Sequence, residues 1–115
     1  MDIRREILKA FADLGGSEAI EGLLDGLHSY NADLRLESAR RLARIRPERA
    51  KSGLLRFLSG YDWDVIRVIL EAFEPPYGLP EDIPTLMSVA QRAPTGTIKY
   101  LATRAINSII GDISN

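Results

Sequence analysis

Residues 33–36 read Asp33-Leu34-Arg35-Leu36, and related sequences stand at equal distances on either side, at Asp2-Ile3-Arg4-Arg5 and Asp64-Val65-Ile66-Arg67. We refer to the separation between Asp33 and each of the two other aspartates as the repeat interval. Each copy opens a run in which apolar residues recur at steps of three and four, as along one stripe of an α-helix. A block that returns at a fixed interval is typical of a protein built from helical repeats. The sequence therefore predicts an all-α solenoid.

A second repeating element lies between these helices. Its apolar positions, which recur after one repeat interval, are Ala19, Leu23, Leu24 and Leu27, then Ala50, Leu54, Leu55 and Leu58. Each unit is therefore expected to be a helical hairpin, and stacked hairpins bury a continuous core. A looser copy follows Pro75-Pro76, a pair that ends the preceding helix. No stretch alternates with a period of two for long enough to predict a sheet.

This periodicity predicts about seven helices, or roughly three and a half hairpins, in a single domain that covers residues 1–115. The expected bounds are a lone helix at 2–14, then pairs at about 17–28 and 33–45, 48–59 and 62–74, and 81–92 and 96–110. Gly60 and Gly111 are expected to end helices, because glycine is favoured just after the last helical turn.

The composition is that of an ordinary globular protein, with 45% hydrophobic and 27% charged residues. A formal charge of −1 gives no global attraction to nucleic acid or to an acidic membrane surface. The lack of cysteine excludes disulfides, thiolate metal sites and a thiol nucleophile. No signal peptide pattern and no run of about 18 apolar residues is present. We therefore expect a cytoplasmic protein without a membrane segment.

The helical pattern Ala-Ile-x-x-Leu-Leu-x-x-Leu at residues 19–27, followed by Asp-Leu-Arg-x-x-x-Ala-x-x-Leu-x-x-Ile at residues 33–45, resembles the short HEAT-like repeat. This type of repeat also occurs in phycobilisome lyase-like proteins, and the resemblance spans essentially the whole chain. It implies an α-α superhelix of the HEAT/armadillo type that serves as a non-catalytic scaffold for binding other proteins. The alternative that it implies is a bilin lyase or a chaperone-like protein related to the phycobilisome lyases.

The sequence departs from this family pattern in the loops between helices. The family often has an aspartate there, stacked on the arginine of the second helix, whereas this chain has Ser29 and Gly60. The arginine itself is displaced in the third copy, from the position after Val65 to Arg67. The sequence therefore does not predict the polar ladder that joins neighbouring repeats in the family.

Few residues could carry chemistry. His28 is the one histidine, and its place at a helix end favours a structural role in satisfying the last carbonyls. The repeated His-Glu pairs of HEAT-like iron hydroxylases are missing, so neither a metal nor a cofactor is expected. Asp62 and Asp64 are expected to cap a helix, and Trp63 is expected to pack over the junction between repeats. We therefore do not expect an enzyme.

Local charge is more informative than the total. From Arg35 to Arg56 there are eight basic residues and two acidic ones, whereas six acidic residues and one basic residue lie between Phe57 and Asp82. In solenoids of this type the second helix of each hairpin lines the concave face, so its outward residues form columns across repeats. The residues predicted to bind a partner on this face are Arg4, Arg5, Lys9, Arg35, Leu36, Arg40, Arg44, Arg67 and Glu71.

Three interpretations of this surface remain open. A groove rich in arginine suits an acidic segment of a partner protein, because guanidinium groups form forked bonds with carboxylates. Nucleic acid could use the same basic stretch, although few aromatic side chains are available to stack on bases. The third interpretation is a solvated face without a partner. At the two ends of the chain, apolar residues without a covering helix suggest a homodimer or a longer array. They are Ile3, Ile7, Phe11, Ile106, Ile109 and Ile110.

Overall fold

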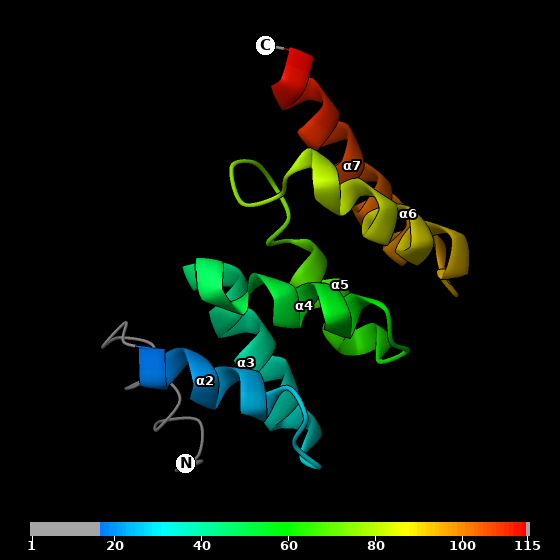
Figure 1. The fold of residues 1–115 in the computed structure, drawn as a ribbon. Helices are drawn as coiled ribbons and strands as arrows, with labels where there is room; N and C mark the ends of the chain where they lie inside the picture. The colour runs from blue at the N-terminus through cyan, green and yellow to red at the C-terminus, as the bar shows by residue number, and fades with distance from the viewer. Residues whose placement is uncertain (1–16, 115) are drawn as a thin grey trace.

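The computed structural model describes residues 17–114, and within them the chain is helical without strands, as the sequence predicts. The elements are α2 (Ser17–Gly26), α3 (Ala32–Ile45), the 3-10 turn η1 (Glu48–Ala50), α4 (Lys51–Leu58), α5 (Trp63–Leu70), the 3-10 turn η2 (Pro80–Asp82), α6 (Ile83–Arg92) and α7 (Gly96–Ser114). They follow one another as three helical hairpins (Figure 1). The helix expected at residues 2–14 lies outside the described residues, and with it Arg4, Arg5 and Lys9.

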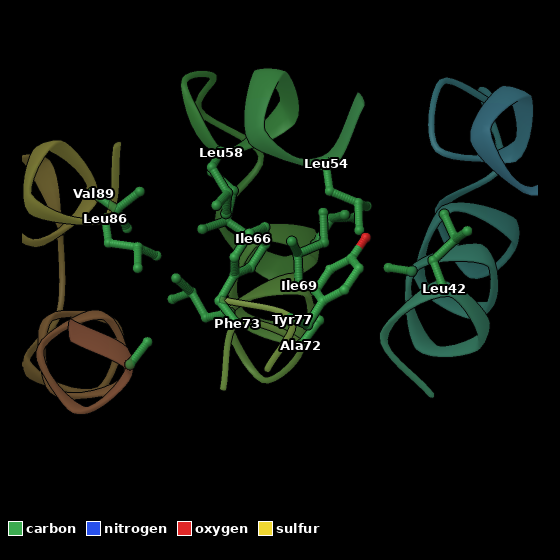
Figure 2. Packing of buried hydrophobic residues seen from close by; sticks show 14 of the residues in the cluster. Leu42, Leu54, Leu58, Ile66, Ile69, Ala72, Phe73, Tyr77, Leu86 and Val89 are labelled. Atoms are coloured by element: carbon green, nitrogen blue, oxygen red, sulfur yellow. The ribbon is translucent and has the colours of Figure 1, made fainter. Parts of the chain in front are cut away.

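The hairpins stack in two layers. Helices α2, α4 and α6 form one layer, and α3, α5 and α7 form the other (Figure 2). Within the second layer α5 contacts α3 on one side and α7 on the other, and in the first layer α4 contacts α6. This arrangement places the second helices of successive repeats side by side, which is the condition for a binding surface that runs across repeats.

In the first two hairpins the core consists largely of apolar positions that recur with the repeat. Leu23 and Leu54 are equivalent and both fully buried, as are Leu42 and Phe73. Figure 2 shows Leu54 and Phe73 in the middle hairpin and Leu42 in the neighbouring one. Each such side chain contributes about 1.5–3 kcal/mol to stability through removal from water. In these hairpins, two residues that are one repeat interval apart therefore occupy equivalent places in the core.

Helix starts also repeat. The Asn31 side chain accepts a hydrogen bond from the amide of Leu34 at 3.1 Å, and the Asp62 side chain accepts one from the amide of Val65 at 3.4 Å. Asn31 and Asp62 are separated by one repeat interval, so the same position caps both second helices. The expectation of a helix cap at this turn is confirmed for Asp62, whereas Asp64 lies inside the first turn of α5.

Two helix ends differ from the prediction. Helix α5 ends at Leu70, because residues 71–73 turn through bonds that reach back three residues, such as Phe73 N to Leu70 O at 3.2 Å. Helix α7 continues through Gly111 to Ser114, whose hydroxyl donates to the Ile110 carbonyl at 3.1 Å. The expected stop at Gly111 is wrong, since glycine in an exposed helix costs only about 1 kcal/mol and Gly111 does not adopt the left-handed conformation that ends helices.

The first junction joins the hairpin α2/α3 to the hairpin α4/α5, and it contains a polar bridge. The Arg35 guanidinium donates to the Asp62 carboxylate at 3.1 Å and to the Ser29 carbonyl at 2.7 Å. The sequence left such a link between repeats in doubt, and the structure contains one at this junction. The carboxylate comes from the helix cap, two residues after Gly60, instead of from the loop position that the family uses.

The second junction joins α4/α5 to α6/α7 and holds a buried ion pair. The Lys51 ammonium lies 2.8 Å from the Asp82 carboxylate, and the two side chains are 9% and 3% exposed. The same carboxylate accepts a hydrogen bond from the Leu79 amide at 2.9 Å. Tyr77 lies beside the pair, with the Lys51 nitrogen 5.5 Å from its ring centre, and donates its hydroxyl hydrogen to the Pro47 carbonyl at 2.8 Å.

Arg92 forms the other polar link of the second junction. Its guanidinium donates to the carbonyls of Leu58 and Gly60 at 2.8 and 2.9 Å, which are unpaired acceptors at the end of α4. The same group lies 5.3 Å from the ring centre of Tyr61 and 5.4 Å from that of Trp63. The expectation that Trp63 packs over a junction between repeats is confirmed.

Candidate functional site

The exposed side of the second layer has a groove between α3 and α5. It encloses about 490 Å³ and is lined by Arg40, Ala43, Arg44, Arg46, Arg67, Val68 and Glu71. We refer to it as the arginine groove. Four guanidinium groups face one carboxylate here, so the groove carries a local excess of positive charge although the whole chain has a formal charge of −1.

Helix geometry explains why these side chains meet. Arg40 and Arg44 are four residues apart on α3 and therefore lie on the same face, and Arg67 and Glu71 have the same relation along α5 and its C-cap. All four side chains are exposed. Arg40 has a distant contact with Glu37, at 3.9 Å, whereas the other oxygen of Glu37 binds Arg41 at 2.9 Å. Glu37 therefore neutralises Arg41 more than it neutralises Arg40.

Arg46 is a lining residue that the sequence analysis did not single out. It follows α3 in a left-handed conformation with φ of 51°, which a residue with a side chain rarely adopts. Its amide bonds to the Leu42 carbonyl at 2.8 Å, and its guanidinium bonds to the carbonyls of Ala43 and Glu71, both at 3.2 Å. These bonds fix the end of α3 against the end of α5, so the wall of the groove is held in place.

A second groove lies between α5 and α7. It encloses about 280 Å³ and is lined by Arg46, Leu70, Glu71, Glu74, Leu101, Arg104 and Ala105. We refer to it as the α5/α7 groove. Leu70 and Ala105 are buried beneath it and Leu101 is half-buried, and the other four lining residues are charged. Glu74 and Arg104 approach each other to 3.6 Å at its rim. Arg46 and Glu71 line both grooves, so the two form one track across α3, α5 and α7.

The structure therefore brings four of the predicted site residues, Arg40, Arg44, Arg67 and Glu71, around one groove. Arg35 and Leu36 do not line it. Arg35 is bound to Asp62 and Ser29 at the first junction, and Leu36 packs against the core. Nothing in the period of the sequence distinguishes Arg35 from an arginine that is free to bind a partner.

The basic stretch from Arg35 to Arg56 is thus less uniform than its composition suggests. Lys51 is buried with Asp82, Arg41 is paired with Glu37, and Arg46 holds two carbonyls. The exposed basic side chains of the stretch are Arg40, Arg44, Arg49 and Arg56. Of these, Arg40 and Arg44 line the arginine groove, so positive charge gathers there and does not spread evenly over the stretch.

The opposite layer contains another hollow, between α2 and α4. Leu24, Leu27 and Phe57 contribute apolar walls to its volume of about 480 Å³, and His28 and Tyr61 stand at its edge. The His28 ring lies against Phe57, with ring centres 5.8 Å apart. The sequence predicts His28 at a helix end, and His28 does follow α2. No pattern in the sequence indicates this hollow.

The C-terminal end of the array is more closed than predicted. Ile109 is buried and Ile106 is half-buried against the core, because α6 and α7 pack along each other. Ile110 and Ile113 are exposed, with 48% and 59% of their surface accessible. Two of the three isoleucines expected to be uncovered at this end therefore belong to the core or its margin. The apolar residues expected to be uncovered at the other end, in the helix at 2–14, lie outside the described residues.

In residues 17–114 no group of three or more histidine, aspartate and glutamate side chains is placed to hold a metal ion. None of the described helices is both long and apolar enough to cross a membrane.

Comparison with known proteins agrees with the architecture. Searches of curated proteins and of solved structures gave no match. A family model described as HEAT repeats matches residues 20–107, which cover the three hairpins up to the middle of α7. HEAT repeats commonly mediate interactions between proteins. With two layers of stacked hairpins and a match over most of its length, this chain belongs to the HEAT repeat family.

Proposed function

We propose that this protein is a non-catalytic scaffold that binds an acidic segment of a partner protein in the arginine groove. The observation that carries the proposal is the convergence of Arg40, Arg44 and Arg67 on one exposed groove that a single carboxylate, Glu71, balances only in part. Arginine forms paired, charge-assisted hydrogen bonds with carboxylates and is enriched at protein interfaces.

The composition of the groove supports binding over catalysis. Its lining holds arginine, alanine, valine and one glutamate, and no histidine, serine, threonine or lysine lines the groove to act together with Glu71 as nucleophile or acid–base partner. The groove is also partly open to solvent, which suits a polypeptide segment better than a small substrate enclosed on all sides. Both features agree with the usual role of HEAT repeats in binding proteins.

A charge reversal tests the proposal. We expect Arg40→Glu/Arg44→Glu to weaken binding of a fluorescein-labelled, aspartate-rich peptide by about ten-fold or more, measured by fluorescence anisotropy. The matched control is Arg49→Glu/Arg56→Glu, which makes the same change in net charge at exposed residues of the same basic stretch outside the groove. We expect this control to weaken binding by less than about two-fold at physiological salt, because it acts only through screened charge.

Two outcomes would contradict the proposal. Equal losses in the two double variants would mean that the peptide responds to overall charge and not to the groove. Tighter binding of single-stranded oligonucleotide than of peptide, lost in Arg40→Glu/Arg44→Glu and steeply dependent on salt, would assign the groove to nucleic acid. Circular dichroism of each variant establishes that the helices are intact in every comparison.

A further inference from the structure

The second junction shows which group fills the space between the ends of two first-layer helices. Arg92, at the end of α6, donates to the Leu58 and Gly60 carbonyls at the end of α4, at 2.8 and 2.9 Å. Its guanidinium also donates to the Ser88 hydroxyl at 3.1 Å and lies 5.3 Å from the ring centre of Tyr61. The chain's own guanidinium group therefore occupies the space between α4 and α6.

The first junction has no arginine at the equivalent place. The residue one repeat interval before Arg92 is Tyr61, and the residue one interval before Ser88 is Phe57. Tyr61 is 75% exposed and Phe57 is half-buried, and both line the hollow of about 480 Å³ between α2 and α4. We refer to this space as the α2/α4 hollow. It is the counterpart, at the first junction, of the space that Arg92 fills at the second.

The end of α2 brings acceptor groups to the hollow. Leu27 lines it and is the counterpart of Leu58, whose carbonyl binds Arg92. Among residues 17–114 nothing donates to the Leu27 carbonyl, whereas the Ser29 carbonyl already accepts from Arg35. The last turn of α2 also contains no basic residue. The negative end of the α2 dipole is therefore not balanced by a cation of its own helix.

The charged residues of the hollow favour a cation beside α2. Asp25 is exposed on α2, and none of the ion pairs between described residues includes it. Asp62 is paired with Arg35 at 3.1 Å, which neutralises most of its effect. Arg56, on α4, is the one arginine in the lining, and it opposes a second cation. Attraction therefore comes from Asp25 and from the end of α2.

The walls of the hollow suit a guanidinium group better than an ammonium group. The His28 and Phe57 rings have centres 5.8 Å apart, and Leu24 adds apolar surface beside them. Guanidinium groups stack on aromatic faces and the arginine stem packs on apolar surface, whereas the ammonium group of lysine is more strongly hydrated. The volume of the hollow also falls within the range of about 300–1,000 Å³ that is typical of binding pockets.

We propose that the α2/α4 hollow binds an arginine side chain of a partner protein. The guanidinium group lies at the end of α2, where it donates to the Leu27 carbonyl and faces Asp25. The arginine stem packs against Phe57 and Leu24. This site belongs to the opposite layer from the arginine groove and selects the opposite charge, so the inference goes beyond the proposed function and does not rest on it.

Peptides that differ in one side chain test the chemistry of the ligand. Binding of acetyl-Gly-Ser-X-Ser-Gly-amide, where X is arginine, citrulline or lysine, is measured by NMR titration of the isotopically labelled protein. We expect the arginine peptide to bind about ten-fold tighter than the citrulline peptide, which has the same shape without the charge, and several-fold tighter than the lysine peptide. The amide signals of His28, Phe57 and Tyr61 should shift.

Three results of this titration would overturn the inference. Equal affinity for the citrulline peptide would assign the hollow to an uncharged side chain, and equal affinity for the lysine peptide would assign it to cations in general. Absence of a saturable shift at His28, Phe57 and Tyr61 would mean that the hollow does not bind the arginine peptide at all.

Two substitutions with opposite expected effects test where the charge is recognised. Asp25→Asn should weaken binding of the arginine peptide several-fold, and Arg56→Gln should strengthen it. Glu21→Gln is the matched control, because it removes a carboxylate from the exposed face of α2 one turn before Asp25 and outside the hollow. It should change the affinity by less than about two-fold at physiological salt. Equal affinity of Asp25→Asn and Arg56→Gln, or an equal loss in Glu21→Gln, would overturn the assignment.

Filling the hollow tests its location. Gly53 lines it, and a Cβ atom at this position would lie 3.0 Å from the flexible end of Leu24. Gly53→Leu should therefore weaken the arginine peptide about ten-fold or more. Gly22 has the same repeat position in the preceding hairpin, and a Cβ atom there meets nothing within 4 Å, so Gly22→Leu is the matched control and should bind normally. Normal binding by a Gly53→Leu protein with an intact helical circular dichroism spectrum would place the peptide elsewhere and overturn the inference.

Discussion

The two junctions between hairpins are joined in different ways. At the first, α3 packs along α5 and the polar bridge from Arg35 to Asp62 lies near the surface, with side chains 28% and 31% exposed. At the second, a longer connection enters between the hairpins, and Lys51, Asp82 and Tyr77 are buried with it. At the first junction, where the repeat is regular, apolar packing is enough to hold the two hairpins together. Where the connection lengthens, its backbone must be fixed by specific polar partners.

The largest expected effect lies at the second junction. Lys51→Met keeps a long apolar stem but leaves the Asp82 carboxylate buried without its cation, which should lower the free energy of unfolding by about 3–5 kcal/mol. Urea denaturation followed by circular dichroism measures the change. Lys51→Met/Asp82→Asn removes the buried charge as well and should be more stable than the single variant. A single variant as stable as the wild type would show that the pair does not hold the junction.

A smaller effect depends on pH and arises at Tyr77. Burial, reinforced by the negative charges of Glu48 and Asp82, raises the pKa of Tyr77 to about 12 from its ordinary value of 10.0. The unfolded chain therefore loses this proton at lower pH than the folded chain does. The stability that the folded chain gains by holding the Tyr77 proton is complete below pH 10 and is lost between about pH 10 and 12. The free energy of unfolding decreases by about 2–3 kcal/mol over this range.

Tyr77→Phe isolates this contribution. The variant loses the hydrogen bond to the Pro47 carbonyl, which should cost about 1 kcal/mol at neutral pH, and it should lack the tyrosine's share of the alkaline destabilisation. Urea midpoints measured from pH 7 to 12 for both proteins give the comparison. Parallel curves for wild type and variant would mean that Tyr77 titrates alike in the folded and unfolded chains.

The smallest expected effect lies at the first junction. Arg35→Ala removes the ion pair with Asp62 and the bond to the Ser29 carbonyl, but water can reach both partners and replace the arginine. We expect a loss of about 1 kcal/mol or less, which decreases further at high salt. Denaturation at low and high salt measures it. A loss as large as that of Lys51→Met would remove the distinction between the two junctions.

The sequence predicted the hairpins because their apolar positions are set by the helix and by the repeat together. Leu23 and Leu54 have the same neighbours in successive hairpins, so one spacing specifies both. The grouping of Arg40 with Glu71 followed from the same rule, since they are one repeat interval apart and lie on adjacent second helices. Helix ends depend on local backbone turns, and the role of Arg35 depends on its exposure. The periodicity of the sequence specifies neither.

The buried polar contacts were missed although the repeat contained a signal for them. Lys51 and Asp82 are separated by one repeat interval, as are Tyr61 and Arg92, and each pair is in contact. Complementary residues at one repeat position of neighbouring hairpins could therefore have been predicted to meet. The left-handed conformation of Arg46 has no such counterpart, because it is a property of the backbone where α3 ends before Pro47.

The buried pair at the second junction also limits which hairpins can be neighbours. The repeat position occupied by Lys51 and Asp82 holds Ile20 in the preceding hairpin, where it is 3% exposed. A shuffled array that stacked the Ile20 hairpin against the Asp82 hairpin would bury a carboxylate beside an isoleucine, without a cation. The hairpins share a backbone plan but are not interchangeable, and so the order in which α3, α5 and α7 present their surface residues is tied to complementary residues inside the second junction.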